Sequence, residues 1–179
     1  VDDVEGGWGH LNYDDFRFHD EEPRFDPELC TLPRDEVEHA GLSPEAAARA
    51  MTVPDGFHVD LIAAEPDLHQ PIALAIDHKG RLWVAEAHSY PVRRAEGEGL
   101  DKILVFEDTD HDGSFETRTV FIDGLNLVSG LEVGHGGVWV GAAPYLLFVP
   151  DADDDLVPDA APKILLDGWG YEDTHETLN

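Results

Sequence analysis

The sequence predicts an all-β protein, a partial β-propeller of about two four-stranded blades plus the start of a third, with an irregular N-terminal arm and one short helix. Two observations predict this class. From Phe57 onward, short apolar runs alternate with Gly, Asp and Pro, as in chains with many short strands. In addition, acidic and apolar motifs recur after 43 residues (Asp108 to Asp151) and 44 residues (Asp123 to Asp167). Repeats of about 40 to 50 residues are typical of propeller blades.

Two segments precede the repeats. Residues 1–42 are acidic and aromatic without regular periodicity, so we expect an extended acidic arm that packs on a neighbour, with a disordered linker as the alternative. Residues 43–56 begin with Ser43-Pro44-Glu45 ahead of an alanine-rich run. This order supplies an N-cap, a proline at the first helical position and an acid in the first turn. We expect one short helix and a linker there, followed by an incomplete propeller domain over residues 57–179.

The strands follow from the apolar runs and the turn residues between them. They are expected at 57–63, 72–76, 81–87, 103–107, 117–122, 129–133, 138–142, 145–149 and 162–167. The four strands between 72 and 122 form one blade, the four between 129 and 167 form the next, and residues 175–179 begin a third. Trp83 and Trp139 occupy equivalent repeat positions and are expected between blades. Because a closed ring needs about four to eight blades, we expect this chain to be the N-terminal part of a longer protein.

The charge balance disfavours several kinds of partner. Eleven Lys and Arg face 39 Asp and Glu, which gives a formal net charge of −28. Such a field repels nucleic acid and anionic lipid and suits divalent cations. No run of about 18 apolar residues occurs, so no membrane insertion of this segment is expected. Cys30 is the single cysteine, so the chain has neither an internal disulfide nor a C-x-x-C-H haem motif.

The clearest local motif has the pattern D-x-D-x-D-G and begins at Asp108. Alternate carboxylates and a glycine at the sixth position let a tight loop fold its oxygens around one hard cation, as in the first half of an EF-hand loop. The bidentate Glu of EF-hands at the twelfth position is replaced by Thr119. We expect a calcium site, with a metal-free acidic turn as the alternative. The candidate ligands are Asp108, Asp110, Asp112, Ser114 and Glu116.

A second acidic loop begins 43 residues later, at Asp151. Here Leu156 stands where the first loop has its glycine, and a leucine resists the positive φ that such loops often require. Metal binding and a metal-free turn therefore both remain open for this loop. Its candidate ligands are Asp151, Asp153, Asp155 and Asp159.

Loops in a propeller alternate between two rims. The acidic loops share one rim with the turns at 77–80 and 134–137. The other rim receives the connections 88–102 and 143–144 and the crossings between blades at 123–128 and 168–174. A concave site with a few convergent polar groups is the default binding site, and we expect it on this second rim. The candidate substrate or cofactor residues there are Glu86, Tyr90, Asn126, Trp169 and Tyr171. A structural role is the alternative for each of these residues. For Glu86 the reason is that a Glu at the end of a strand is usually solvated or capped.

Several separated blocks carry a family resemblance. They are FHVDLIAAEP from Phe57, GRLWVAEA from Gly80, EDTDHDG from Glu107, NLVSGLEV from Asn126, GVWVGAAPYLLF from Gly137 and DTHETLN from Asp173. These blocks resemble the start of the membrane-bound dehydrogenases of planctomycete bacteria and their relatives, over roughly residues 43–179. The resemblance implies a propeller similar to soluble pyrroloquinoline-quinone sugar dehydrogenases, and haem only in a C-terminal cytochrome domain beyond this chain.

The same resemblance implies catalytic roles for His175 and Asp173. In those sugar dehydrogenases a histidine directly preceded by Asp stands just before the inner strand of a blade. A neutral imidazole there takes the proton of a sugar hydroxyl while hydride passes to the quinone. Here one residue separates Asp173 from His175, so a purely structural hydrogen bond is the alternative.

Two functions remain open from the sequence. The first is a secreted oxidoreductase that acts on a small sugar or alcohol, with calcium and a quinone-type acceptor, in the periplasm, outside the cell or at its surface. The second is a non-catalytic propeller that binds glycan or protein at the cell surface. In both cases the expected partners are the remaining blades or the cytochrome of the parent protein, and this segment by itself is expected to be inactive.

Overall fold

The computed structural model describes residues 41–172, which are mostly β. The expected arm at 1–42 lies almost entirely outside these residues, and so do the start of a third blade and the pair Asp173 and His175. One helix, α1 (Pro44–Ala50), precedes eight strands. The strands are β1 (Pro71–Ile76), β2 (Leu82–Glu86), β3 (Asp101–Glu107), β4 (Thr117–Leu125), β5 (Val128–Val133), β6 (Gly137–Ala142), β7 (Tyr145–Pro150) and β8 (Lys163–Asp167).

The short helix α1 forms where the capping residues predict it. The Ser43 hydroxyl oxygen accepts a hydrogen bond from the backbone N–H of Ala46 at 3.2 Å, and Pro44 occupies the first turn. The helix ends at Ala50, because Met51 has an extended backbone with φ −68° and ψ 135°. Within residues 41–172 no helix is both long and apolar enough to cross a membrane.

The predicted strand at 57–63 is wrong. The structure has no strand between Met51 and Gln70, although the alternating pattern of this segment suits one. A strand needs a hydrogen-bonded neighbour, and no strand of the described residues pairs with this segment. Ala63 and Leu68 instead pack their side chains against the first sheet, so the apolar residues here serve as a cover.

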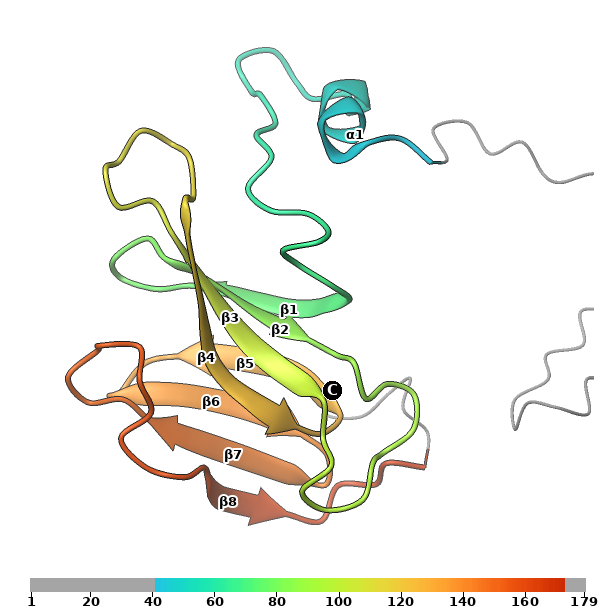
Figure 1. Ribbon diagram of the computed structural model, residues 1–179, viewed down its shortest axis with the longest axis vertical. Coiled ribbons are helices and arrows are strands. Elements are labelled where there is room, and N and C mark those ends of the chain that lie inside the picture. The colour runs from blue at the N-terminus through green and yellow to red at the C-terminus, as the bar shows by residue number, and fades with distance from the viewer. Residues whose placement is uncertain (1–40, 173–179) are drawn as a thin grey trace, which may run out of the picture. The chain divides into compact units, whose positions relative to one another are not determined.

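The eight strands form two four-stranded antiparallel sheets, in the orders β1-β2-β3-β4 and β5-β6-β7-β8. Each sheet follows the chain order, so neighbouring strands are joined by hairpin connections (Figure 1). The predicted grouping of these eight strands into two consecutive sets of four is therefore confirmed. β5 lies against β1 and β2, which brings the first strands of the two sheets together.

The register gives each sheet two distinct faces. In the first sheet Trp83 pairs with Val105, whereas the next pair along the strands joins Val84 to Leu104. Successive side chains of a strand point to opposite sides, so these pairs lie on different faces. We call the face that carries Trp83 the forward face, and the face that carries Val84 the rear face. The same names apply to the second sheet at the equivalent repeat positions.

The forward face of the first sheet packs against the rear face of the second. Their shared core combines Trp83, Ala85, Ile103 and Val105 with Val138, Val140, Leu147 and Val149. Because unlike faces meet, the same operation can be repeated by further sheets, and such contacts close into rings when the rotation permits. A sandwich with two-fold symmetry would bring like faces together. The packing is therefore consistent with two consecutive blades of a partial propeller.

The two outer faces differ in their cover. On the rear face of the first sheet, Ala63, Leu68 and Phe115 pack over Val84, Leu104 and Phe106. On the forward face of the second sheet, the rings of Trp139 and Phe148 lie 5.0 Å apart and are half-buried. Trp83 is 1% exposed, as expected for a residue between blades. Trp139 is more exposed because, among the described residues, no third sheet packs against the forward face of the second sheet.

Candidate functional site

The first acidic loop, residues 108–116, connects β3 to β4 and wraps around its own carboxylates. Asp108 accepts hydrogen bonds from the backbone N–H groups of Asp112 at 3.2 Å and Gly113 at 2.9 Å. Glu116 closes the loop by accepting from the backbone N–H of Thr109 at 2.9 Å. These bonds gather the carboxylates of Asp108, Asp110 and Asp112, which each offer an oxygen within 4.8 Å of the others.

The second acidic loop, residues 151–159, repeats this network between β7 and β8. Asp151 accepts from the backbone N–H groups of Asp155 at 3.2 Å and Leu156 at 3.3 Å. Asp159 closes the loop by accepting from the N–H of Ala152 at 2.7 Å. The carboxylates of Asp151, Asp153 and Asp155 also lie within 4.8 Å of one another.

The backbone of the two loops matches at their unusual positions. The fourth residues, His111 and Asp154, have φ angles of 62° and 61°. The sixth residues, Gly113 and Leu156, have φ angles of 95° and 67°. The expectation that leucine would resist this conformation is therefore wrong. Leu156 is 9% exposed and belongs to the core between the sheets, so the burial of its side chain offsets the backbone strain.

Both loops have the donor chemistry of a hard cation site. Carboxylate oxygens on a tightly turned loop are the ligands that Ca²⁺ prefers, so each Asp triad can bind a metal such as calcium. Burial raises the pKa of Asp151, although backbone N–H groups act in the opposite direction. In the first loop, the hydrogen bond from the Thr109 side chain is the main cause that lowers the pKa of Glu116. A cation beside Asp151 would offset the cost of its burial as a charged group.

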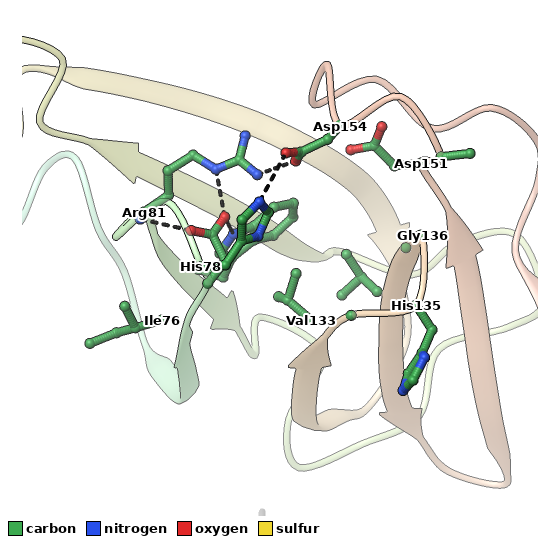
Figure 2. Close-up of a pocket in the computed structure, with 14 residues that line it drawn as sticks. Ile76, His78, Arg81, Val133, His135, Gly136, Asp151 and Asp154 are labelled. Atoms are coloured by element: carbon green, nitrogen blue, oxygen red, sulfur yellow. Dashed lines mark hydrogen bonds and ion pairs between the residues drawn. The ribbon is translucent and has the colours of Figure 1, made fainter.

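The second loop is also linked to the first sheet by a chain of ion pairs (Figure 2). Arg81 donates from Nε to Asp77 at 2.5 Å and from Nη2 to Asp154. Lys79 pairs with the same Asp154 carboxylate. Asp77 further accepts from Trp83 Nε1 at 2.9 Å. The side chains of Asp77 and Arg81 are 1% and 6% exposed, so this linkage is buried.

Charge and burial compete in this linkage. Burial alone raises the pKa of Asp77, but hydrogen bonds from Trp83 and Arg81 outweigh it and hold the pKa below its usual value. For Asp154, the hydrogen bonds from Lys79 and Arg81 likewise outweigh the effect of burial and lower its pKa. For Arg81, burial opposes the charge, but hydrogen bonds from its guanidinium to Asp154 and Asp77 outweigh it and raise the pKa.

A cavity of about 460 Å³ lies beside these ion pairs. It is lined by His78 from the β1–β2 turn, by His135 and Gly136 from the β5–β6 turn, and by Asp151 and Asp154 of the second acidic loop (Figure 2). This confirms that the turns at 77–80 and 134–137 share a rim with an acidic loop. The Asp151 and Asp154 carboxylates that line it already accept hydrogen bonds from the chain itself. The cavity therefore lies between groups that already hold the two sheets together.

On the opposite rim, the side chains of Asn126 and Asp101 hold the long connection and the crossing between the sheets in place. Asn126 accepts from the backbone N–H of Arg94 at 3.0 Å and donates from Nδ2 to the Arg94 carbonyl at 2.9 Å. The Asp101 carboxylate, which is fully buried, accepts from the N–H groups of Ser89 and of Val128. The predicted meeting of the 88–102 connection with the crossing at 123–128 is confirmed by these bonds.

Glu86 ends β2 on this rim and is 1% exposed. Its carboxylate accepts from the backbone N–H of His69 at 2.7 Å and lies 2.9 Å from Nε2 of His88. Burial alone raises the pKa of Glu86, but the hydrogen bonds from His88 and His69 outweigh it and lower the pKa. The carboxylate is thus ionised and fixes the orientation of the His88 ring. His88, with its side chain 25% exposed, is the member of the pair that a ligand can reach.

The other predicted residues of this rim occupy separate places. The Tyr171 ring lies over the guanidinium of Arg93, with 5.4 Å between the ring centroid and Cζ. Trp169 is 36% exposed and donates its backbone N–H to the Pro144 carbonyl at 3.3 Å. Tyr90 is 46% exposed. Asn126 and Tyr171 therefore meet the two adjacent arginines, whereas Glu86 is bound by two histidines. Asp173 and His175 lie outside the described residues.

Sequence reasoning missed Asp77, Arg81, Asp101 and the pairing of His88 with Glu86. Asp77 directly follows β1, and Asp101 is the first residue of β3. A carboxylate at the end of an apolar strand is a signal for a capped turn, which these two residues provide. Arg81 pairs with the nearby Asp77, but its second partner Asp154 is 73 residues away, so no local signal predicts that link.

These features define a repeat protein of two blade-like sheets, each with an acidic loop that can bind a metal. Residues 43–179 match the model of a family described as "Domain of unknown function (DUF7133)", and the chain belongs to this family. No curated protein shows a significant match to the chain, and no solved structure does either.

Proposed function

We propose that this chain is the calcium-binding part of a propeller oxidoreductase that acts on a sugar or alcohol. The observation that carries the calcium proposal is the recurrence of one loop, with one hydrogen-bond network, on two consecutive sheets. The reaction class is supported by the sequence resemblance to dehydrogenases. The periplasm, the extracellular space or the cell surface supplies calcium at the millimolar level that such modules use.

Calcium fits these loops better than other common metals. Each loop offers three carboxylates, a fourth carboxylate at the ninth position and no Cys or His ligand in its triad, which disfavours zinc. Magnesium demands near-ideal octahedral geometry and retains several waters, whereas Ca²⁺ accepts irregular sets of oxygens. The acidic loops therefore match calcium in both donor type and flexibility.

Calcium binding is tested by titrating the chelator-treated chain with Ca²⁺ in a calorimeter and by following thermal unfolding. We expect two binding events, and each is removed by one substitution, Asp110→Asn for the first loop or Asp153→Asn for the second. Glu132→Gln, an exposed acid on β5 away from the triads, serves as the control and leaves both events intact. Absence of heat and of stabilisation at millimolar calcium would contradict the proposal.

The rim opposite the acidic loops supplies a candidate proton acceptor. A Glu86 carboxylate bonded to Nε2–H of His88 leaves the other ring nitrogen unprotonated, so it can accept the proton of a substrate hydroxyl. The same carboxylate stabilises the imidazolium that forms. In an alcohol oxidation this proton transfer accompanies hydride transfer to an acceptor.

The described residues do not fit pyrroloquinoline quinone as that acceptor. A tricarboxylate of this kind requires cations near the reacting group. Of the described cations, Lys102 pairs with Glu86 across the strands, whereas Arg93 lines a separate groove. One lysine does not balance three carboxylates. We therefore assign no step to the quinone, and a role for it rests on the resemblance alone.

The reaction is tested by dye reduction with a panel of sugars and alcohols, using protein that contains this chain and calcium. We expect turnover that falls about a hundredfold in His88→Gln, since general base catalysis typically contributes about 10² to 10⁴. His78→Gln, on the rim of the acidic loops, is the matched control and keeps full activity. If no substrate reduces the dye, or if His88→Gln is fully active, this part of the proposal fails while the calcium part stands.

A further inference from the structure

A second cavity, of about 220 Å³, lies in the groove between the sheets. Its apolar side is formed by Leu147, Ile164 and Tyr145 of the second sheet, and its polar side by Arg93 and Glu96 of the long connection. At about 30 Å³ per water, its volume equals that of about seven waters, which suits one monosaccharide-sized group.

The wall formed by residues 93–99 is held in place. Asn126 exchanges two hydrogen bonds with the backbone of Arg94. At Gly99 a Cβ atom would lie 2.2 Å from the Leu125 carbonyl oxygen, so only glycine allows this close approach of the connection to β4. The Arg93 guanidinium is therefore presented to the groove from an anchored backbone, and the Tyr171 ring supports it from one side.

Arg93 uses only part of its hydrogen-bonding edge. Its Nη2 donates to Oε2 of Glu96 at 2.8 Å. Its Nε is buried and has no hydrogen-bond partner among the described residues. Nε and Nη2 form the edge with which arginine binds a carboxylate at two points, and buried donors in proteins normally have a partner. Glu96, with its side chain 80% exposed, satisfies only one of the two points.

We infer that this groove binds the carboxylate of an acidic sugar, such as a hexuronate unit, through both points of Arg93. Glu96 swings into solvent and the ligand carboxylate takes its place, while the sugar ring lies on the apolar side chains of the second sheet. Aromatic and aliphatic side chains beside a few placed polar groups are typical of ligand pockets. The inference does not depend on the proposed oxidation, because the groove and the His88 pair are separate.

The charge of the chain favours a singly charged ligand group. With a net charge of −28, each further negative charge on a ligand is repelled. A carboxylate carries one charge and matches the planar edge of arginine, whereas a phosphate monoester carries about two. A sulfate ester shares the single charge and is the alternative source of the same oxyanion chemistry.

The test is calorimetric titration of the chain with galacturonate, galactose 6-sulfate and neutral galactose, with calcium present. We expect galacturonate to bind at least about tenfold more tightly than galactose, which corresponds to one charge-assisted pair. Arg93→Lys keeps the charge but loses the two-point edge, and it should weaken galacturonate about tenfold. Glu96→Gln removes the competing carboxylate and should tighten galacturonate several-fold. Arg94→Lys is the matched control and should change nothing.

The results of the titration either support or overturn the inference. Preference for galactose 6-sulfate over galacturonate, with the same dependence on Arg93, would support an oxyanion groove and assign its ligand to sulfated sugars. Equal binding of galactose and both acidic sugars would overturn the inference. So would weaker binding in Glu96→Gln, or an equal loss in Arg93→Lys and Arg94→Lys. Far-ultraviolet circular dichroism of each variant shows whether it is folded.

Discussion

The two acidic loops share one backbone and one hydrogen-bond network but differ in what surrounds them. In the first loop the fourth residue is the exposed His111 and the sixth is the exposed Gly113. In the second loop the fourth residue, Asp154, is paired with Arg81 and Lys79 of the first sheet, and the sixth, Leu156, lies in the core. The acidic loop of the first sheet is thus exposed at these two positions, whereas the acidic loop of the second sheet is part of the contact between the sheets.

This difference separates two requirements of a cation loop. The carboxylate spacing and the N–H bonds are common to both loops, so they are sufficient to gather three oxygens within 4.8 Å. The glycine is not required for the backbone shape, since Leu156 adopts φ 67° when its side chain is buried. We therefore expect the first loop to respond mainly to calcium, and the second to respond to calcium and to the packing of the sheets.

The largest expected effect is that of Arg81→Met. This change leaves the carboxylates of Asp77 and Asp154 without their shared cation, and breaking a buried ion pair costs about 4 kcal/mol of unfolding free energy. Urea unfolding measures it. His111→Met alters the first loop at a residue without such a link, and the expected change is within about 0.5 kcal/mol. Equal stability of the two variants would show that the linkage does not hold the sheets together.

The next effect concerns the sixth residue. Leu156→Ala keeps the positive φ but removes a buried side chain, and we expect a loss of about 3 kcal/mol in unfolding free energy. Gly113→Ala meets open space, so its cost is limited to the backbone strain of about 1 kcal/mol. Thermal unfolding of both variants with a chelator present makes the comparison. A larger loss for Gly113→Ala would mean that the core contact of Leu156 is unimportant.

The third prediction compares the loops through calcium. A ligand at a hundredfold excess over its dissociation constant stabilises the folded state by about 2.7 kcal/mol per site. In the Asp110→Asn variant, where only the second loop binds, calcium should also increase the coupling between the sheets, because that loop contacts both. In the Asp153→Asn variant the remaining site lies within the first sheet. Hydrogen exchange of β5 and β1 should therefore slow more with calcium in the first variant than in the second.

The outcome shows which features a single sequence can predict. The 43-residue repeat and the capped helix depend on residues close together in the chain, and spacing alone predicted both acidic loops. The strand at 57–63 failed because pairing depends on a neighbour that local pattern does not reveal. The link between Arg81 and Asp154 joins residues 73 apart, and only the stacking of the sheets brings them together.

The candidate site shows the same difference between features that depend on nearby residues and features that depend on distant ones. Asn126 and Glu86 were singled out because they lie on the predicted rim, and the structure places Asn126 on the crossing between the sheets and Glu86 at the end of β2. Their partners were not predictable, since the roles of His69 and Arg93 depend on how long connections fold back. Burial also changed the meaning of Glu86, which is covered by two histidines and orients one of them.

The smallest expected effect is the acid response, and its sign differs within the second loop. Asp77 and Asp154 have lowered pKa values, so their ionised forms stabilise the fold above the unfolded value of 3.8, and this stabilisation is lost as the pH falls through their folded values. Asp151 has a raised pKa, so its protonation favours the folded state as the pH falls towards 3.8. Each group contributes up to about 1.4 kcal/mol per pH unit within its own window.

Asp151 acts above pH 3.8 and the two groups with lowered pKa values act below it, so without calcium the unfolding free energy should fall as the solution is acidified past that point. Urea unfolding between about pH 5 and about pH 3 measures the slope. Asp77→Asn keeps an oxygen that accepts from Trp83 but cannot titrate, so its slope should be shallower than that of the parent chain. A slope that is unchanged in Asp77→Asn would mean that the buried linkage around Arg81 does not control acid stability, and would remove the main electrostatic difference between the two loops.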